Sequence, residues 1–156
     1  MKRILLFILV FSTPFMIVMA QTNLNVTPIF EGKIIPQKQM VETLVKGEQA
    51  KSYKLSLFHS LKMEVEAEKC HDIEELVRKD CGGLESPYVQ EYGMKEGRLS
   101  YLIAQLPDQH DDHVFLCYQC YESEKGKLCI TLVYMEGPAT IKDLYKMFKT
   151  DKNKKK

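Results

Sequence analysis

The sequence lacks the short motifs by which many enzymes are identified. It contains no G-x-S-x-G nucleophile elbow, no H-E-x-x-H zinc helix and no glycine-rich phosphate loop. It also lacks a basic surplus, because 15 Lys and Arg stand against 20 Asp and Glu over residues 21–148. A mildly acidic body argues against nucleic-acid binding, which needs clustered Lys and Arg. We therefore expect no nucleic-acid partner and no bound cofactor, and we favour a protein that is not an enzyme.

A long apolar run occurs once, at the N-terminus. A basic start precedes an apolar stretch over residues 4–19, which ends at Ala20 before the polar Gln21. This order is typical of a cleavable signal peptide. The alternative is an uncut membrane anchor, but the run is shorter than the ~20 residues that span a bilayer. We expect residues 1–20 to be removed, leaving an exported domain with no stable membrane insertion.

The remaining chain is long enough for one domain with its own core. We assign residues 21–148 to that single domain. Residues 149–156 carry five Lys and one Asp, and we expect them to form a disordered tail. The tail is either a solubilising end or a contact for anionic envelope surfaces.

Alternating apolar residues give the clearest structural signal, over residues 53–65. Every second residue from Tyr53 to Val65 is apolar or His59, and mostly polar residues lie between them. A period of two predicts a strand with one buried face. Other segments that predict strands are 24–30, 98–106, 113–122 and 128–135. Residues 40–46 predict either a strand or a short helix, and their alternation favours a strand. Residues 84–97 contain Pro87, Gly93 and Gly97 and predict a loop.

Two segments predict helices. Residues 67–81 carry an apolar stripe at steps of three and four, and Gly82 follows as a stop. Thr140 is typical of a helix N-cap, with Asp143 three residues later. The order is therefore β-β-β-α-β-β-β-α. We predict an α+β fold: an antiparallel sheet of five to six strands with two helices packed on one face.

Five cysteines raise the question of disulfides, since export would permit them. Cys117 and Cys120 form a C-x-x-C pair, but three residues apart in a strand they point to opposite faces, which disfavours a redox or metal centre. Cys120 and Cys129 flank the turn at 123–126, within cross-strand reach of each other. We name them as a candidate disulfide; the alternative is that both are buried thiols.

Residues 110–113 read His-Asp-Asp-His and are a candidate metal site, with His110, Asp112 and His113 as ligands. The alternative is a solvated hairpin loop, where Asp is common for turn reasons. Aromatic residues suggest a second kind of site. Phe115, Tyr118 and Tyr121 lie on one predicted strand and would form a binding surface if exposed; the alternative is ordinary packing within the sheet.

Several segments resemble an uncharacterised family of small exported proteins of Gram-negative anaerobes. They are FEGKIIPQKQMVETLVKG at 30–47, YKLSLFHSL at 53–61, FLCY at 115–118 and ITLVYMEG at 130–137. The resemblance implies a domain of unknown function in the periplasm or cell envelope, with no activity or site residue to transfer. We hypothesise a non-enzymatic binding or structural module whose partner is an envelope protein or glycan. The alternative is a small periplasmic metal-binding protein or hydrolase that uses the His110–His113 loop.

Overall fold

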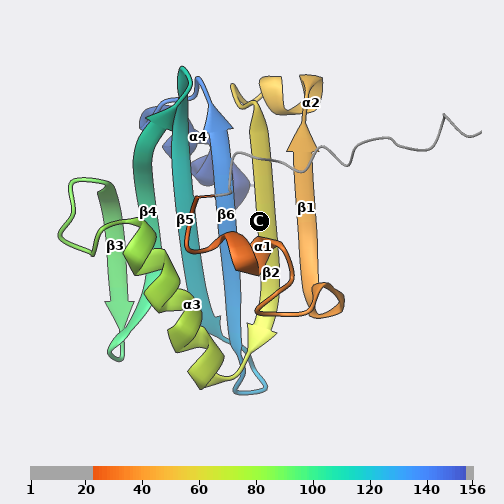
Figure 1. Ribbon diagram of the computed structural model, residues 1–156, viewed down its shortest axis with the longest axis vertical. Coiled ribbons are helices and arrows are strands. Elements are labelled where there is room, and N and C mark those ends of the chain that lie inside the picture. The colour runs from red at the N-terminus through yellow and green to blue at the C-terminus, as the bar shows by residue number, and fades with distance from the viewer. Residues whose placement is uncertain (1–22, 154–156) are drawn as a thin grey trace, which may run out of the picture.

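The computed structural model describes residues 23–153, so the predicted signal peptide lies outside the described residues. Six strands form one antiparallel sheet in the order β1-β2-β6-β5-β4-β3 (Figure 1). The strands are β1 Met40–Lys46, β2 Leu57–Val65, β3 Val89–Lys95, β4 Arg98–Gln109, β5 Asp112–Glu122 and β6 Leu128–Gly137. The helices are α1 Thr27–Phe30, the 3₁₀ helix η2 Gln37–Gln39, α2 Glu48–Lys51, α3 Ala67–Asp80 and α4 Ile141–Asn153. The predicted α+β class is confirmed.

Two predicted elements differ from the structure. Residues 24–30, predicted as a strand, contain the short helix α1, because Pro28 lies in its first turn and its fixed φ suits that position. Residues 84–97, predicted as a loop, contain β3. Its apolar residues are sparse and its pairing with β4 is irregular, so the period-two signal is weak. The element order becomes β-β-α-β-β-β-β-α, apart from the short helices.

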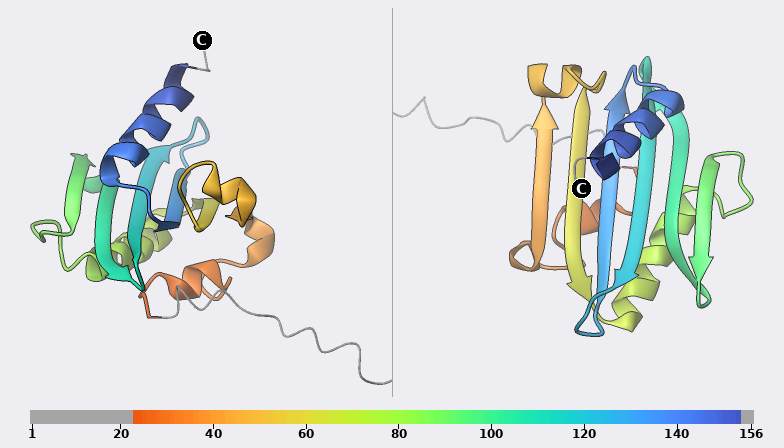
Figure 2. Two further views of the ribbon diagram at one scale, coloured as in Figure 1. Left: turned by 90° about the horizontal axis from the view of Figure 1, so that it is seen from above. Right: turned by 180° about the vertical axis from the view of Figure 1, so that it is seen from behind.

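The two long helices cover opposite faces of the sheet, whereas the predicted arrangement put both on one face (Figures 1 and 2). On the α3 face, Cys70, Ile73 and Val77 pack against the main core. On the α4 face, Leu144 packs against Phe115 and a smaller core. The reason is visible in β5, where residues 114–118 are buried without a break. A strand buried on both sides needs cover on both sides.

The period-two signal of residues 53–65 is confirmed from Leu57 onward, since burial alternates along β2. The strand starts later than predicted because the chain first forms α2 and then passes the end of β6. Gly137 permits this close approach: its φ is 152°, and a Cβ there would lie 2.6 Å from Leu55 Cα. Within residues 23–153, none of the helices has the length and apolar character needed to cross a bilayer.

The start of α4 is held by a reciprocal cap, as the Thr140 prediction implied. The Asp143 amide donates to Thr140 Oγ1 at 3.3 Å, and Asp143 Oδ2 accepts from the Thr140 amide at 3.0 Å. Lys54 Nζ lies 3.1 Å from Asp143 Oδ1. Chiefly because the Thr140 amide donates to it, the carboxyl of Asp143 has a pKa of about 2, below its ordinary value. The helix continues past Phe148 to Asn153.

Candidate functional site

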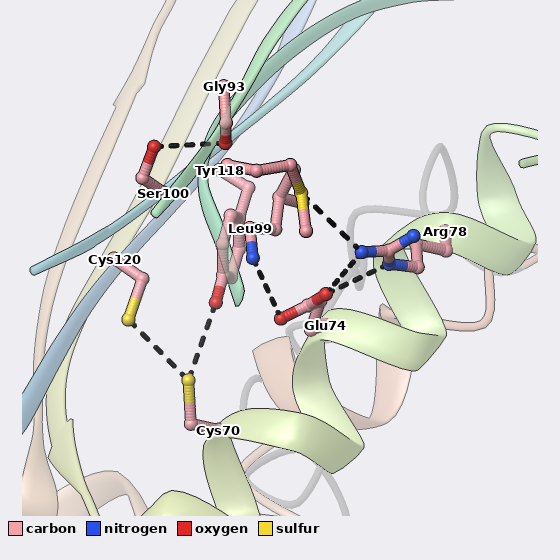
Figure 3. Close-up of polar contacts among 9 residues, drawn as sticks. Cys70, Glu74, Arg78, Gly93, Leu99, Ser100, Tyr118 and Cys120 are labelled. Carbon is pink, nitrogen blue, oxygen red and sulfur yellow. Dashed lines mark hydrogen bonds and ion pairs between the residues drawn. The ribbon is translucent and has the colours of Figure 1, made fainter. Parts of the chain in front are cut away.

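Two cysteines from different elements meet between α3 and β5. Cys70 lies in the first turns of α3, and Cys120 lies near the end of β5. Their sulfur atoms are 3.5 Å apart, and the Tyr118 hydroxyl lies 3.6 Å from Cys70 Sγ (Figure 3). Tyr118 and Cys120 are two residues apart on the strand, so both side chains point to the α3 face. The arrangement is a thiol pair with a phenol beside it.

The environment keeps Cys120 and Tyr118 protonated. Burial, followed by the hydrogen bond with Cys70, raises the pKa of the Cys120 thiol to about 11. The Tyr118 hydroxyl and the Arg98 charge act in the opposite direction on Cys120. Burial also raises the pKa of Tyr118. A thiol with a raised pKa is a weak nucleophile at neutral pH, so Cys120 lacks the activation that a catalytic cysteine needs.

Glu74, one turn after Cys70, is a buried carboxylate that sequence reasoning missed. Acidic residues on a helix are usually exposed to solvent. Instead, Arg78 Nε and Nη2 donate to Glu74 Oε1 at 2.9 and 2.6 Å, and the Leu99 amide donates to Oε2 at 3.2 Å (Figure 3). Both carboxylate oxygens are therefore paired, which is the condition for burying such a charge. The contact fastens α3 to the start of β4.

The other cysteines do not form a shared site. Cys120 pairs across the sheet with Ile130, and Cys129 pairs with Tyr121. This one-residue offset sends Cys120 and Cys129 to opposite faces, so the structure does not bring the predicted disulfide partners together. Cys117 packs in the α4-face core while Cys120 packs on the α3 face, as the C-x-x-C spacing predicted. All five cysteines are free thiols.

Two of the three candidate metal ligands, Asp112 and His113, are held by separate partners. The β4–β5 loop is only His110 and Asp111, shorter than predicted, because β4 extends to Gln109. Asp112 Oδ2 accepts from Ser56 Oγ at 2.8 Å, and His113 Nδ1 lies 2.9 Å from Asp108 Oδ1. Over residues 23–153 the structure has no group of three or more His, Cys, Asp or Glu side chains able to hold a metal ion. The geometry thus does not assemble the predicted site.

The three aromatic residues predicted as a binding surface do not form one. Phe115 and Tyr118 are buried, on opposite faces, and Tyr121 alone of the three is exposed. The strand was correctly predicted, but β5 lies in the middle of the sheet, where both faces are covered. Its aromatic residues therefore contribute to packing, as the alternative interpretation held.

β1, which forms one edge of the sheet (Figure 1), carries two exposed apolar side chains, one on each face. Val41 is 69% exposed and Leu44 is 46% exposed. Seven consecutive residues of β1 pair with β2 without a register shift, and the outer side of the strand pairs with no other strand of the sheet. A regular, open edge with apolar side chains is a template for pairing with another strand.

The opposite edge, β3, is protected in the ways that sheet edges commonly are. Its pairing with β4 has two register shifts, and such bulges twist an edge away from further pairing. Gly93 is covered by the Tyr101 ring, since a Cβ there would lie 2.3 Å from that ring. The Tyr101 hydroxyl in turn donates to Glu91 at 3.0 Å. Tyr101, on the neighbouring strand β4, thus supports the edge strand β3.

Two surface clefts accompany these features. One, of about 70 Å³, is lined by Cys120 together with Lys95, Arg98 and Glu122 among others. The other, of about 560 Å³, lies beside α2 and is lined by Leu55, Pro138 and the stems of two lysines, among others. Neither lining contains a histidine. Neither cleft therefore pairs a nucleophile with a histidine base, the usual arrangement for nucleophilic catalysis.

Fold and site together define a small antiparallel α+β domain with one open sheet edge and one buried thiol pair. The chain belongs to the family of unknown function DUF6108, whose model matches residues 13–148. No curated protein and no solved structure matches the chain. Membership of this family assigns no activity, so the functional argument rests on the geometry.

Proposed function

We propose that the chain is an exported, non-enzymatic module of the cell envelope that works by associating with a second copy of itself through β1. The leader-like residues 1–20 and the resemblance to exported proteins support the location. The observation that carries the association is the open edge of β1. The rival hypothesis, a metal-binding protein or hydrolase built on residues 110–113, has no comparable support, because Asp112 and His113 are bound to separate partners.

The physical reason for association is the exposure of β1 on its free side. Its burial pattern shows five exposed residues and two partly buried ones. The strand contains neither proline nor glycine, the residues that most often disrupt an edge. Adding an antiparallel strand here would bond its outward N–H and C=O groups and cover Val41 and Leu44.

The sequence of β1 favours an identical strand as the occupant. In an antiparallel pair centred on Leu44, Leu44 lies opposite the Leu44 of the second copy. The Glu42 of each copy then lies opposite the Lys46 of the other. Directly opposed unlike charges and apolar residues are favourable cross-strand pairs. All three residues lie on the same face of the strand, the α3 face. Two-fold symmetry of this kind is the commonest form of protein association.

The carboxylate of Glu42 remains available for this pairing. Its Oε1 lies 2.6 Å from His59 Nε2 on β2, yet the Glu42 side chain is still 41% exposed. The contact with His59 draws the carboxylate toward β2 and restricts its position. A fixed acid beside an exposed Leu44 gives the edge a preferred register.

The test is the association state of the full chain, expressed with its own leader and recovered as the cell exports it. Sedimentation velocity over a concentration series should show a reversible dimer of the wild type. Leu44→Lys places two like charges opposite each other and should leave a monomer. Met94→Lys is the matched control, because Met94 is 45% exposed on the other edge strand, β3. The Met94→Lys protein should remain a dimer.

A charge exchange tests the register. Glu42→Lys alone should weaken the dimer, and adding Lys46→Glu in the same chain should restore it. A wild type that remains monomeric at all accessible concentrations would refute self-association through β1. So would equal weakening by Leu44→Lys and Met94→Lys. The mass of the recovered protein shows separately whether the leader is cut after Ala20, which tests export.

A further inference from the structure

The thiol pair between α3 and β5 has the geometry of an unformed cross-link. Cys70 Sγ and Cys120 Sγ are in contact at 3.5 Å, and a disulfide requires about 2.0 Å. A combined approach of about 1.5 Å closes the gap, within the range of small side-chain rotations. The two residues are 50 positions apart in the chain. Their contact is therefore produced by the fold and not by local sequence.

We propose that Cys70 and Cys120 form a disulfide that fastens α3 to β5, made by exchange with a disulfide oxidant. The oxidant is a small-molecule disulfide or a disulfide-carrying oxidoreductase, written RSSR. The two protein thiols and RSSR give one protein disulfide and two RSH. Both thiol hydrogens and two electrons pass to the oxidant, so atoms and charge balance. The chemistry is independent of the β1 proposal.

Access decides which cysteine reacts first. Cys120 is half-buried and lines the cleft of about 70 Å³, whereas Cys70 is buried. We therefore assign the first step to Cys120, which attacks RSSR and forms a mixed disulfide while the first RSH leaves. Cys70, already in contact with Cys120, then attacks the Cys120 sulfur and displaces the second RSH. The cross-linked chain results.

The surroundings of Cys120 set the conditions for this reaction. The Tyr118 hydroxyl and the charge of Arg98 both act to lower the pKa of Cys120. Burial acts in the opposite direction and has the larger effect, so the pKa is raised to about 11. The thiolate is thus scarce at neutral pH, and exchange in the folded chain is slow. The rate of thiol–disulfide exchange should rise with pH up to about pH 11, the pKa of Cys120. Fast closure requires a chain that is still folding, in which the thiols are exposed.

The cross-link would complete the attachment of α3. The helix is fastened to the start of β4 by the Glu74 carboxylate (Figure 3). Its first turns, by contrast, contact β5 only through packing and the weak contacts of Cys70. A disulfide at Cys70 would add a covalent link at the end of the helix where only packing and these weak contacts hold it.

The experiment maps disulfides in the full chain. The purified protein is reduced, exposed to oxidised glutathione, digested at low pH and examined by mass spectrometry. The wild type should lose the mass of two hydrogens and yield a peptide that links Cys70 to Cys120. Cys129→Ala, altered in the same β5–β6 hairpin but on the other face, should give the same link. Cys120→Ala should give none.

A further variant covers the case in which substitution disturbs folding. Cys70→Ala leaves Cys120 accessible but removes its partner, so a glutathione adduct should accumulate at Cys120. In the wild type that adduct should be transient. A persistent wild-type adduct, a Cys120–Cys129 peptide or no change in mass would each overturn the proposal. None of these results depends on whether Leu44→Lys alters association, so the two proposals fail separately.

Discussion

Closing the Cys70–Cys120 bond should raise the stability of the domain by an amount that the chain length fixes. The bond encloses a loop of about 50 residues, since the cysteines are 50 positions apart. In the chain-entropy account, such a loop restricts the unfolded state by roughly 4 kcal/mol at 25 °C. Residual strain from drawing the sulfurs together reduces this, so we expect about 2 to 4 kcal/mol.

For a domain of this size, 1 kcal/mol corresponds to roughly 4 °C in the melting temperature, so oxidation should raise Tm by about 8 to 16 °C. Differential scanning calorimetry of the oxidised and the reduced protein measures this difference. The comparison is made within each variant, because replacing a buried thiol also leaves a small cavity that affects both states. Cys129→Ala should keep the full difference between oxidised and reduced protein.

The reasoning would be refuted in either of two ways. The first is an oxidised wild type, with the bond mapped to Cys70 and Cys120, that melts within about 2 °C of the reduced protein; this would mean that strain cancels the entropic gain. The second is an equal oxidation-dependent shift in Cys120→Ala, because that variant cannot form the bond.

Two further predictions concern single carboxylates. Glu74→Ala leaves the buried Leu99 amide without its acceptor and should lower the free energy of unfolding by about 2 to 3 kcal/mol. The control Glu75→Ala, at an exposed position, should change the free energy of unfolding by less than about 0.5 kcal/mol. Urea unfolding of both variants measures the contrast. Asp143 has a pKa of about 2, against an ordinary value of 3.8, so its ionised form stabilises the cap of α4 above about pH 4, and this contribution is lost as the pH falls toward 2. The stability difference between the wild type and Asp143→Asn should therefore be largest near neutral pH and shrink below pH 4; a gap that does not change with pH would contradict the assignment.

Local patterns were sufficient to predict most of the elements. The alternation in β2, the stripe of α3 and the Thr140 cap depend on neighbours within a few residues, and each was found in the structure. The two hairpins among β4, β5 and β6 were also predicted, with ends displaced by up to three residues. Such signals work because strand and helix periods appear directly in the sequence.

The remaining features depend on strand order and register, which local patterns do not contain. Phe115 and Tyr118 were misplaced because α3 covers one face of β5 and α4 covers the other, and the packing of these helices depends on residues distant in the sequence. Cys129 lies opposite Tyr121, one residue away from the register that would place it opposite Cys120. This difference puts the thiols of Cys120 and Cys129 on opposite faces of the sheet. The stripe of α3 marked Cys70 as buried, but only the crossing of α3 over β5 identifies Cys120 as its neighbour.

The two proposals concern different halves of the sheet, and this division follows from how the helices are attached. α3 is joined to β4 through Glu74 and to β5 through Cys70, so the half of the sheet from β5 to β3 is held by contacts outside the strands. β1 pairs with β2 alone, and its exposed side chains have least cover. Reduction of the Cys70–Cys120 disulfide should therefore weaken the attachment of α3 and leave the β1 edge unchanged. Association through β1 should not depend on whether these cysteines are oxidised. If association did follow oxidation, a change at α3 would have to reach β1 through the elements between them, and neither proposal contains such a coupling.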